Sequence, residues 1–182
     1  MISFLILWAA PLPAAETVLV FDPAQTRIEW TLGATLHTVH GTFQLRSGTI
    51  RFDAASGKAS GELIVDARSG ASGNGDRDAK MHNAILESAR FPDIVLVPDR
   101  VEGTVPAQGS AALTVHGIFK LHGTEHELAV PVRVEMAPGQ VTATATFAVP
   151  YIRWGLKNPS TFLLRVADKV DVQIHAIARI RP

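Results

Sequence analysis

Hydrophobic and polar residues alternate along most of the chain after residue 15. The clearest case is residues 127–136, in which Leu and Val residues and Met136 occupy every second position. A period of two places these side chains on one face of an extended strand. Similar segments, separated by Gly, Pro, Asp and Asn, are 27–32, 42–46, 49–52, 61–67, 94–98, 111–121, 141–149 and 169–180. The pattern predicts about eight or nine strands of an all-β, antiparallel domain.

One segment departs from the alternation. Met81, Ile85 and Ala89 recur at intervals of four, which places them on one face of a helix. Arg90-Phe91-Pro92 ends the pattern, because the residue before a proline favours extended backbone. We therefore expect one short helix inserted around residues 75–89.

A closed barrel suits these elements, because closure removes the exposed edges of an antiparallel sheet. The interior of an eight-stranded barrel is either filled by side chains or holds one small ligand. Small residues alternate with threonines in 141–149, which is compatible with space on one side of that strand and equally with a filled core. Periodicity alone leaves both alternatives open.

The amino-acid composition limits the classes of molecule that this protein can bind. The 182 residues include 17 Lys and Arg, 17 Asp and Glu, and no cysteine. Zero net charge gives no general attraction to nucleic acid, so we expect no nucleic-acid partner. Without cysteine there are no disulfides, thiolate zinc sites, iron–sulfur clusters or thiol nucleophiles.

The first fifteen residues form a separate segment. Residues 2–10 are almost wholly apolar, and prolines and alanines follow before Glu16. The apolar run is too short for a membrane-spanning helix, which needs about 20 residues. The segment predicts an export signal at residues 1–15, a barrel domain at 16–182, a periplasmic or secreted location and no integral membrane span. A buried N-terminal strand or a surface anchor is the alternative.

The histidines do not form a convincing metal site. His37 and His40 are three residues apart in an extended stretch, so they point to opposite faces. His122 and His126 flank an expected hairpin turn, where solvated polar residues are usual. We expect no metal and no cofactor.

Catalytic motifs are also absent from the sequence. No stretch has the spacing of a nucleophile elbow or of a dinucleotide-binding loop. Asp76 and Asp78 lie at the start of the expected helix, where a carboxylate caps free N–H groups and complements the helix dipole. We therefore predict no catalytic residues and no enzyme activity.

Five motifs follow one another along the chain. They are Phe21 to Trp30, with Thr26 where Ser is usual; His40-Gly41-Thr42-Phe43; Arg77-Asp78 to Phe91-Pro92-Asp93-Ile94; Leu113 to Lys120; and Tyr151 to Leu156. In this order the motifs resemble those of the YceI-like family of lipid-binding proteins. The resemblance covers nearly all of residues 17–181.

This resemblance implies a lipocalin-like barrel that holds a long apolar lipid, such as a polyprenyl chain or a quinone tail, without catalysis. The candidate cavity residues are Trp30, Phe43, Met81, Phe91, Phe147, Tyr151 and Trp154. The candidates for head-group contacts at the mouth, by motif position, are Arg77, Asp78, His82 and Arg153. A ligand cavity and a packed core are formed by the same kinds of apolar side chain. The four polar candidates could equally attach the helix to the barrel.

Two other functions remain open from the sequence. The first is an enzyme of isoprenoid or quinone-linked chemistry, in which His82, Asp78 or Arg153 would converge on one pocket. The second is a stress-related barrel with a closed cavity that acts through protein contacts. A homodimer is compatible with each of these functions.

Overall fold

Antiparallel strands make up most of the described chain. The computed structural model describes residues 16–35, 37–161 and 165–181, so the predicted export signal at residues 1–15 lies outside the described residues. The strands in this part are β1 (Glu16–Phe21), β2 (Arg27–Gly33), β3 (Thr38–Asp53), β4 (Ala59–Ala71), β5 (Asp93–Glu102), β6 (Gly109–Leu121), β7 (Thr124–Ala137), β8 (Gln140–Val149) and β9 (Val170–Arg181). Alternating apolar residues in these segments bury one face of each strand.

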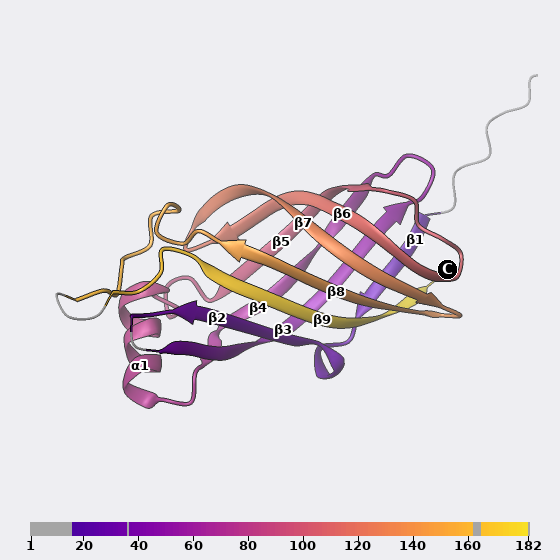
Figure 1. Ribbon diagram of the computed structural model, residues 1–182. Coiled ribbons are helices and arrows are strands. Elements are labelled where there is room, and N and C mark those ends of the chain that lie inside the picture. Colours follow the sequence, from indigo (N-terminus) through magenta and orange to yellow (C-terminus); the bar gives the residue numbers. More distant parts are fainter. Residues whose placement is uncertain (1–15, 36, 162–164, 182) are drawn as a thin grey trace, which may run out of the picture.

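The strands close into a barrel (Figure 1). From β3 to β9, each strand pairs with the next one along the chain, and β1 and β2 both lie between β3 and β9. A 3-10 turn, Pro23–Gln25, separates β1 from β2, and Asp22 caps this turn by accepting from the Ala24 N–H. The nine strands of the described chain therefore occupy eight positions, which confirms the predicted eight-stranded antiparallel barrel.

The predicted helix is present at one end of the barrel. It consists of α1 (Gly75–Lys80) and a π-helical turn, Met81–Ile85. The side chain of Asn74 caps α1 by accepting from the Arg77 N–H at 3.0 Å. Asp76 and Asp78, the capping residues predicted from the sequence, lie two and four residues after this cap, because Asn74 precedes the glycine that begins the helix.

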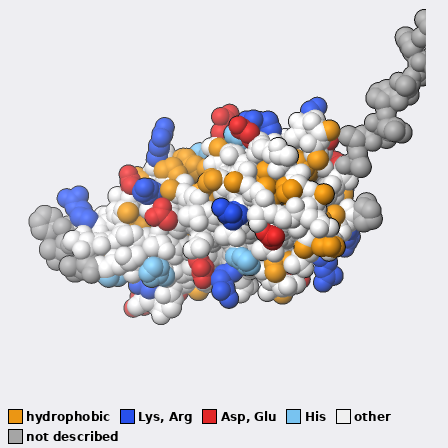
Figure 2. Space-filling view, turned by 45° about the vertical axis from the view of Figure 1, so that its right-hand side comes forward, with side chains coloured by type: hydrophobic (Ala, Val, Ile, Leu, Met, Phe, Trp, Pro, Cys, Tyr) orange, Lys and Arg blue, Asp and Glu red, His pale blue; other side chains and the backbone are white. Residues whose placement is uncertain are grey.

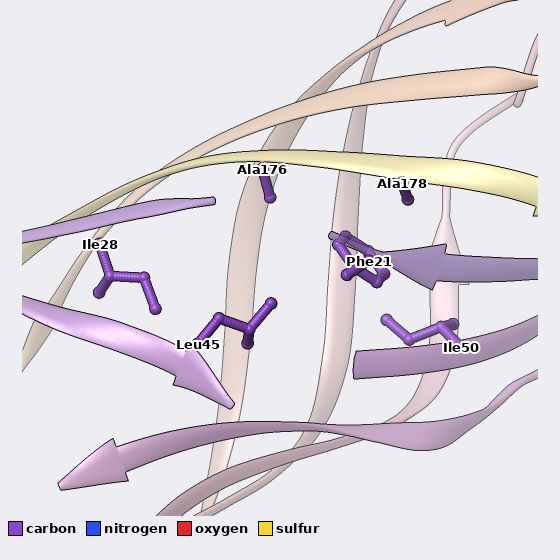
Figure 3. Packing of buried hydrophobic residues seen from close by; sticks show 6 residues of the cluster. All are labelled: Phe21, Ile28, Leu45, Ile50, Ala176 and Ala178. Atoms are coloured by element: carbon purple, nitrogen blue, oxygen red, sulfur yellow. The ribbon is translucent and has the colours of Figure 1, made fainter. Parts of the chain in front are cut away.

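Two clusters of buried side chains fill the barrel interior at the end away from α1. Figure 3 shows side chains from β1, β2, β3 and β9 directed into the space between the strands. This packed cluster consists of Phe21, Ile28, Leu45, Ile50, Ala176 and Ala178. A far cluster of buried residues consists of Leu113, Val134 and Val141. The hydrophobic effect of these two groups stabilises the half of the barrel that is closed by β1.

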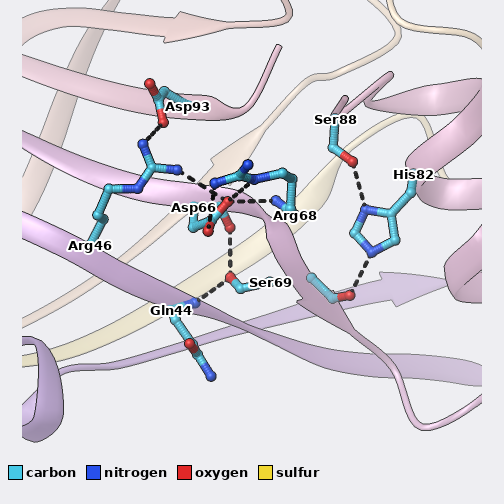
Figure 4. A network of polar contacts seen from close by, with 9 residues as sticks. Gln44, Arg46, Asp66, Arg68, Ser69, His82, Ser88 and Asp93 are labelled. Atoms are coloured by element: carbon cyan, nitrogen blue, oxygen red, sulfur yellow. Dashed lines mark hydrogen bonds and ion pairs between the residues drawn. The ribbon is translucent and has the colours of Figure 1, made fainter. Parts of the chain in front are cut away.

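The outer surface carries charges of both signs, interspersed with hydrophobic side chains on the face shown in Figure 2. On β3 to β5, Arg46 contacts both Asp66 and Asp93, and Arg68 also pairs with Asp66 (Figure 4). The hydrogen bond from Arg68 lowers the pKa of Asp66. Because these charged side chains are partly exposed to water, each pair adds little to stability and mainly fixes side-chain positions.

Candidate functional site

A cavity of about 550 Å³ occupies the end of the barrel that carries α1. Its wall is almost entirely hydrocarbon. The residues that form the wall are Ile28, Trp30, Leu32, Ala34, Val39, Phe43, Val65, Met81, Ile85, Leu86, Ile94, Phe119, Leu121, Phe147, Val149, Tyr151, Leu156, Pro159, Val166, Val170, Val172 and Ile174. The interior of this barrel is therefore solid in one half and hollow in the other.

Strand periodicity explains how the wall is assembled. On β8, Phe147 and Val149 face the cavity, and on β9, Val170, Val172 and Ile174 do so. Because successive strand residues point to opposite faces, the residues between them lie on the outside of the barrel. Gln173, for example, is exposed between two cavity residues.

The helical segment covers one side of this cavity. Arg77, Met81 and Ile85 recur at intervals of four, Lys80 follows Arg77 by three residues, and all four border the cavity. This spacing places them on one helical face, with the apolar pair following the charged pair. The helix therefore presents hydrocarbon to the barrel interior and cations to the mouth.

The mouth differs from the wall in carrying charged and polar residues. His37, Asp76, Arg77 and Lys80 border the cavity there. Lys80 Nζ donates to the main-chain oxygen of Pro159 at 3.2 Å, so a cation joins α1 to the connection between β8 and β9. A chain that fills the cavity would have its outer end beside these groups.

Five of the seven candidate cavity residues border this space, and two lie elsewhere. Trp30, Phe43, Met81, Phe147 and Tyr151 line the cavity. Trp154 instead stacks on His126, with ring centroids 4.2 Å apart, and touches the edge of the wall through Phe119. Because Trp154 belongs to the turn after β8, it supports the cavity wall from the side that faces away from the cavity.

Phe91 is the other aromatic residue outside the cavity. Its ring packs on His122, with centroids 4.4 Å apart. His122 Nε2 in turn lies 2.6 Å from Glu87 Oε2. Both partners of this pair have positive φ angles, 52° and 45°, a conformation that costs about 1 kcal/mol or more for such residues. These contacts fasten the end of the helical segment to the turn between β6 and β7.

Two of the candidate mouth residues are joined through Ser72. Asp78 accepts from both the main-chain N–H and the hydroxyl of Ser72, and the hydroxyl hydrogen bond lowers the pKa of this carboxyl group. Arg77 borders the cavity, and it donates through Nε to Ser72 Oγ at 2.7 Å and through Nη2 to Ser72 O at 2.9 Å. Asp78 thus holds α1 on the end of β4.

The other two mouth candidates are not at the cavity wall. The ring of His82 bridges Gly70 O, at 2.8 Å from Nε2, and the buried hydroxyl of Ser88, at 3.0 Å from Nδ1 (Figure 4). This geometry satisfies both ring nitrogens and anchors the helical segment. Arg153 is exposed and does not border the cavity, because its neighbours in the turn, Tyr151 and Leu156, take the inward positions.

Sequence reasoning missed Lys80 and His37 at the mouth. Lys80 could have been found from helical spacing, since it follows Arg77 by three residues and precedes the inward-facing Met81. His37 comes from the connection between β2 and β3, whose position over the cavity depends on barrel closure. No local pattern could have indicated it.

Within residues 16–35, 37–161 and 165–181, no group of three His, Cys, Asp or Glu side chains is placed to hold a metal ion. Nor does this part contain a helix long and apolar enough to cross a membrane.

Tyr151 closes the cavity wall where β8 ends. Its hydroxyl donates to Ala167 O at 2.7 Å, which ties the two ends of the connection between β8 and β9 together. Burial raises the pKa of Tyr151 to about 12, from the ordinary value of 10.0. The phenol is therefore neutral, and able to donate, at any physiological pH.

Replacing Tyr151 by Phe should lower the free energy of unfolding by about 1 kcal/mol at neutral pH, because it leaves the Ala167 carbonyl without its buried donor. A group whose pKa is raised by folding stabilises the protein below its unfolded pKa and loses that contribution as pH rises through its folded pKa. The difference between wild type and Tyr151→Phe should therefore vanish between pH 10 and 12. Thermal unfolding of both proteins at increasing pH measures it; a difference that persists unchanged at pH 12 contradicts the assignment.

Comparison with solved structures agrees with this architecture. BcnA of Burkholderia cenocepacia superposes with a TM-score of 0.71 and 16% identity over 86% of this chain and 98% of that one. A polyisoprenoid binding domain from Saccharophagus degradans superposes with a TM-score of 0.66 and 12% identity over 90% of this chain and 98% of that domain. At these identities the likeness shows the barrel fold alone.

Curated relatives give a different and weaker similarity. UDP-N-acetylglucosamine 1-carboxyvinyltransferase 1 of Staphylococcus epidermidis is 26% identical over 153 residues, which cover 79% of this chain and 34% of that protein. The Staphylococcus aureus proteins of the same name are 24% identical over 152 residues. The chain spans about a third of the length of the curated relatives it matches.

A family model decides the classification. The model of the YceI-like domain matches residues 19–178, which run from β1 into β9 and include the entire cavity wall. The motifs from Phe21 to Leu156 all fall within this match. The chain therefore belongs to the YceI-like family.

Proposed function

We propose that this protein binds an apolar, isoprenoid-like lipid in the barrel cavity and carries or sequesters it without catalysis. The observation that supports this most strongly is a cavity of about 550 Å³ whose wall is hydrocarbon and whose polar residues gather at one end. The polyisoprenoid binding domain from Saccharophagus degradans, which has the same fold, agrees with this class of ligand.

The energetics favour such a ligand. Moving one CH₂ group from water into hydrocarbon gains about 0.8 kcal/mol. A chain of several isoprene units can therefore bind tightly after the cost of ordering it and of losing its free translation has been met. Affinity comes from the apolar wall, while contacts at the mouth select the end group.

The mouth suits a polar or anionic end group. Arg77 and Lys80 both border the cavity there, and Asp76 is the single carboxylate among the described lining residues. The ammonium group of Lys80, carried on a flexible side-chain stem, can reach an oxygen that protrudes from the cavity. Asp78, His82 and Arg153 are not part of this proposal, because two of them anchor the helical segment and the third lies away from the cavity.

A binding role fits the polar groups better than catalysis does. His82 and Asp78, the residues that an enzyme would need in the pocket, are engaged with Ser88, Gly70 and Ser72. The activity of the Staphylococcus relatives is not extended to this chain, because a charged nucleotide sugar would lose its hydration against a hydrocarbon wall. The open cavity likewise argues against a barrel that acts only through protein contacts.

The proposed location is the periplasm or the cell exterior. The apolar segment at residues 2–10 and the alanines that follow support export. Expression of the full chain in a bacterial host, followed by cell fractionation and N-terminal sequencing, tests this part. Accumulation of uncleaved protein in the cytoplasm would contradict it.

Purified protein, prepared without detergent from a bacterial host, should release a stoichiometric apolar lipid on extraction into organic solvent. Mass spectrometry of the extract identifies the lipid. Val172→Glu, which places a carboxylate on the cavity wall, should abolish lipid recovery, because an unpaired charge is strongly disfavoured there. Gln173→Glu, the same change at the exposed neighbouring position of β9, should recover lipid as wild type does.

Circular dichroism verifies that both variants are folded. If Val172→Glu does not fold, Phe147→Lys provides a second charged wall on β8, with the exposed Thr146→Lys as its control. Equal lipid recovery from wall variant and control would overturn the proposed site, as would an extract of wild-type protein that contains no lipid.

A further inference from the structure

The barrel interior is divided across its length. The cavity lies at the α1 end and borders the packed cluster of Phe21, Ile28, Leu45, Ile50, Ala176 and Ala178, whose side chains are drawn in Figure 3. Ile28 belongs to both, since it is a member of the cluster and borders the cavity. The hollow half therefore ends on a wall of packed side chains.

Among the residues that border both the cavity and the packed cluster, three are paired side by side on adjacent strands. Ile28 of β2 is paired in register with Phe43 of β3 on one side and with Ile174 of β9 on the other. All three border the cavity, and Phe43 and Ile174 pack against the cluster behind them. We call this row, Phe43, Ile28 and Ile174, the cavity floor.

The space beneath the floor is filled. Leu45, Ala176 and Ala178 are 6%, 4% and 0% exposed. Protein interiors are packed as densely as organic crystals, so a ligand that pushed past the floor would have to displace side chains from their rotamers and strands from their register. The floor therefore acts as a stop for a chain that enters from the mouth.

The volume above the floor sets the length of chain that fits. We take each carbon group of the ligand to fill roughly 30 Å³, the volume that one water molecule occupies in the liquid. On this basis the 550 Å³ cavity holds about 18 carbon atoms. This number corresponds to between three and four isoprene units. Chains of eight or more units would exceed the space at least twofold.

We propose that the cavity is selective for chain length and buries about four isoprene units, with the cavity floor as the residues that set this limit. The inference rests on the proposed function, because it assumes that the cavity holds an apolar chain. It adds the size class of the ligand and assigns the specificity to Phe43, Ile28 and Ile174. Longer chains bind with their additional units outside the mouth. Those units stay in water, so they bury no further apolar surface.

A series of prenols measures the limit. Geraniol, farnesol, geranylgeraniol and a prenol of eight isoprene units compete with the apolar dye N-phenyl-1-naphthylamine, whose fluorescence reports a hydrocarbon environment. Affinity should rise by about tenfold or more with each unit up to four, because each unit buries more hydrocarbon. From four units to eight it should change by less than about threefold, because the added units stay in water.

Variants of the floor should move this plateau. Leu45→Ala together with Ile174→Ala removes about six carbon atoms, close to one isoprene unit, from the floor and the layer behind it. Affinity should then continue to rise to about five units. The matched control is Leu113→Ala together with Val134→Ala, which removes similar hydrocarbon from the far cluster and should leave the plateau at four.

If the deepened variant does not fold, Ile174→Phe tests the same idea in the opposite direction. The larger side chain raises the floor, so the plateau should fall to about three units. Affinity that continues to rise from four units to eight in wild type overturns the length limit, and so does a plateau that is unchanged in every folded floor variant. Failure of every prenol to displace the dye instead overturns the proposed function.

Discussion

Replacing Gly41 by Ala is expected to destabilise the protein by about 3 kcal/mol, at the upper end of the range for overpacking. A Cβ at this position would lie 2.3 Å from Trp30 Cζ2 and 2.4 Å from the main-chain oxygen of Ala71. The indole could move only into the cavity, and the carbonyl could move only with β4. The substitution should therefore lower the melting temperature by about 10 °C and change the shape of the cavity wall.

Gly33→Ala is the matched control in the paired strand. Gly33 ends β2, and the nearest atom to its added Cβ would be Ala167 Cβ at 3.9 Å, an ordinary contact distance. This variant should melt at the wild-type temperature or slightly above it, because alanine restricts the unfolded chain more than glycine does. Thermal unfolding followed by circular dichroism compares the two. Equal melting temperatures would show that Trp30 does not require the bare Gly41 backbone.

Phe21→Ala should cost about 4 kcal/mol, the usual range for removing a phenylalanine from a well-packed core. Phe21 is 8% exposed and belongs to the packed cluster. Its ring is surrounded by side chains of β3 and β9, so truncation leaves a cavity that rigid strands cannot close. Urea-induced unfolding measures the loss.

Phe147→Ala is the comparison in the hollow half. Its ring already borders open space, so fewer contacts are lost on truncation, and the cost should be about 2 kcal/mol or less in lipid-free protein. The same variant enlarges the cavity and should therefore affect lipid binding more than Phe21→Ala does. Equal losses of stability at Phe21 and Phe147 would contradict the division of the barrel into packed and hollow halves.

Much of the fold could be predicted from local pattern. Alternation in residues 127–136 and in the other segments identified the strands, and the intervals of four from Met81 to Ala89 identified the helical insertion. The sequence predicts separate strands at residues 42–46 and 49–52, on either side of Ser47-Gly48, whereas β3 runs continuously from Thr38 to Asp53 with a shift of register between Leu45 and Ser47. Ser47-Gly48 is compatible with a turn and with a β-bulge, and only the pairing of β3 with β4 distinguishes the two.

The hollow interior could not be located from the sequence. The small residues of β8 are compatible in sequence with either space or a filled core, and the structure shows the filled core: Ala143 packs against the far cluster, Ala145 is buried, and neither borders the cavity. The cavity instead lies between large side chains such as Trp30, Phe119 and Phe147. Small side chains let opposite strands come close together, so the interior between them is filled. Large side chains border a cavity only where no side chain from the opposite wall fills the space between them.

The polar candidates show a related limit. The motif that contains Arg77, Asp78 and His82 lies at the cavity end of the barrel, but Asp78 and His82 attach the helical segment through their hydrogen bonds. Motif position indicates where a residue lies along the chain. Its hydrogen-bond partners, Ser72, Gly70 and Ser88, decide whether it faces the cavity or the barrel wall.

The single strand position shared by β1 and β2 has a consequence for motion. β1 pairs with the distal part of β3, residues 49–53, and closes the packed half, whereas β2 pairs with residues 38–43 and closes the hollow half. The Pro23–Gln25 turn interrupts the two strands, yet β2 is tied to the packed half through Ile28, which is 5% exposed and belongs to the packed cluster. Local unfolding is cheapest where few apolar contacts are lost, so β2 is expected to open together with the packed half and not separately from it.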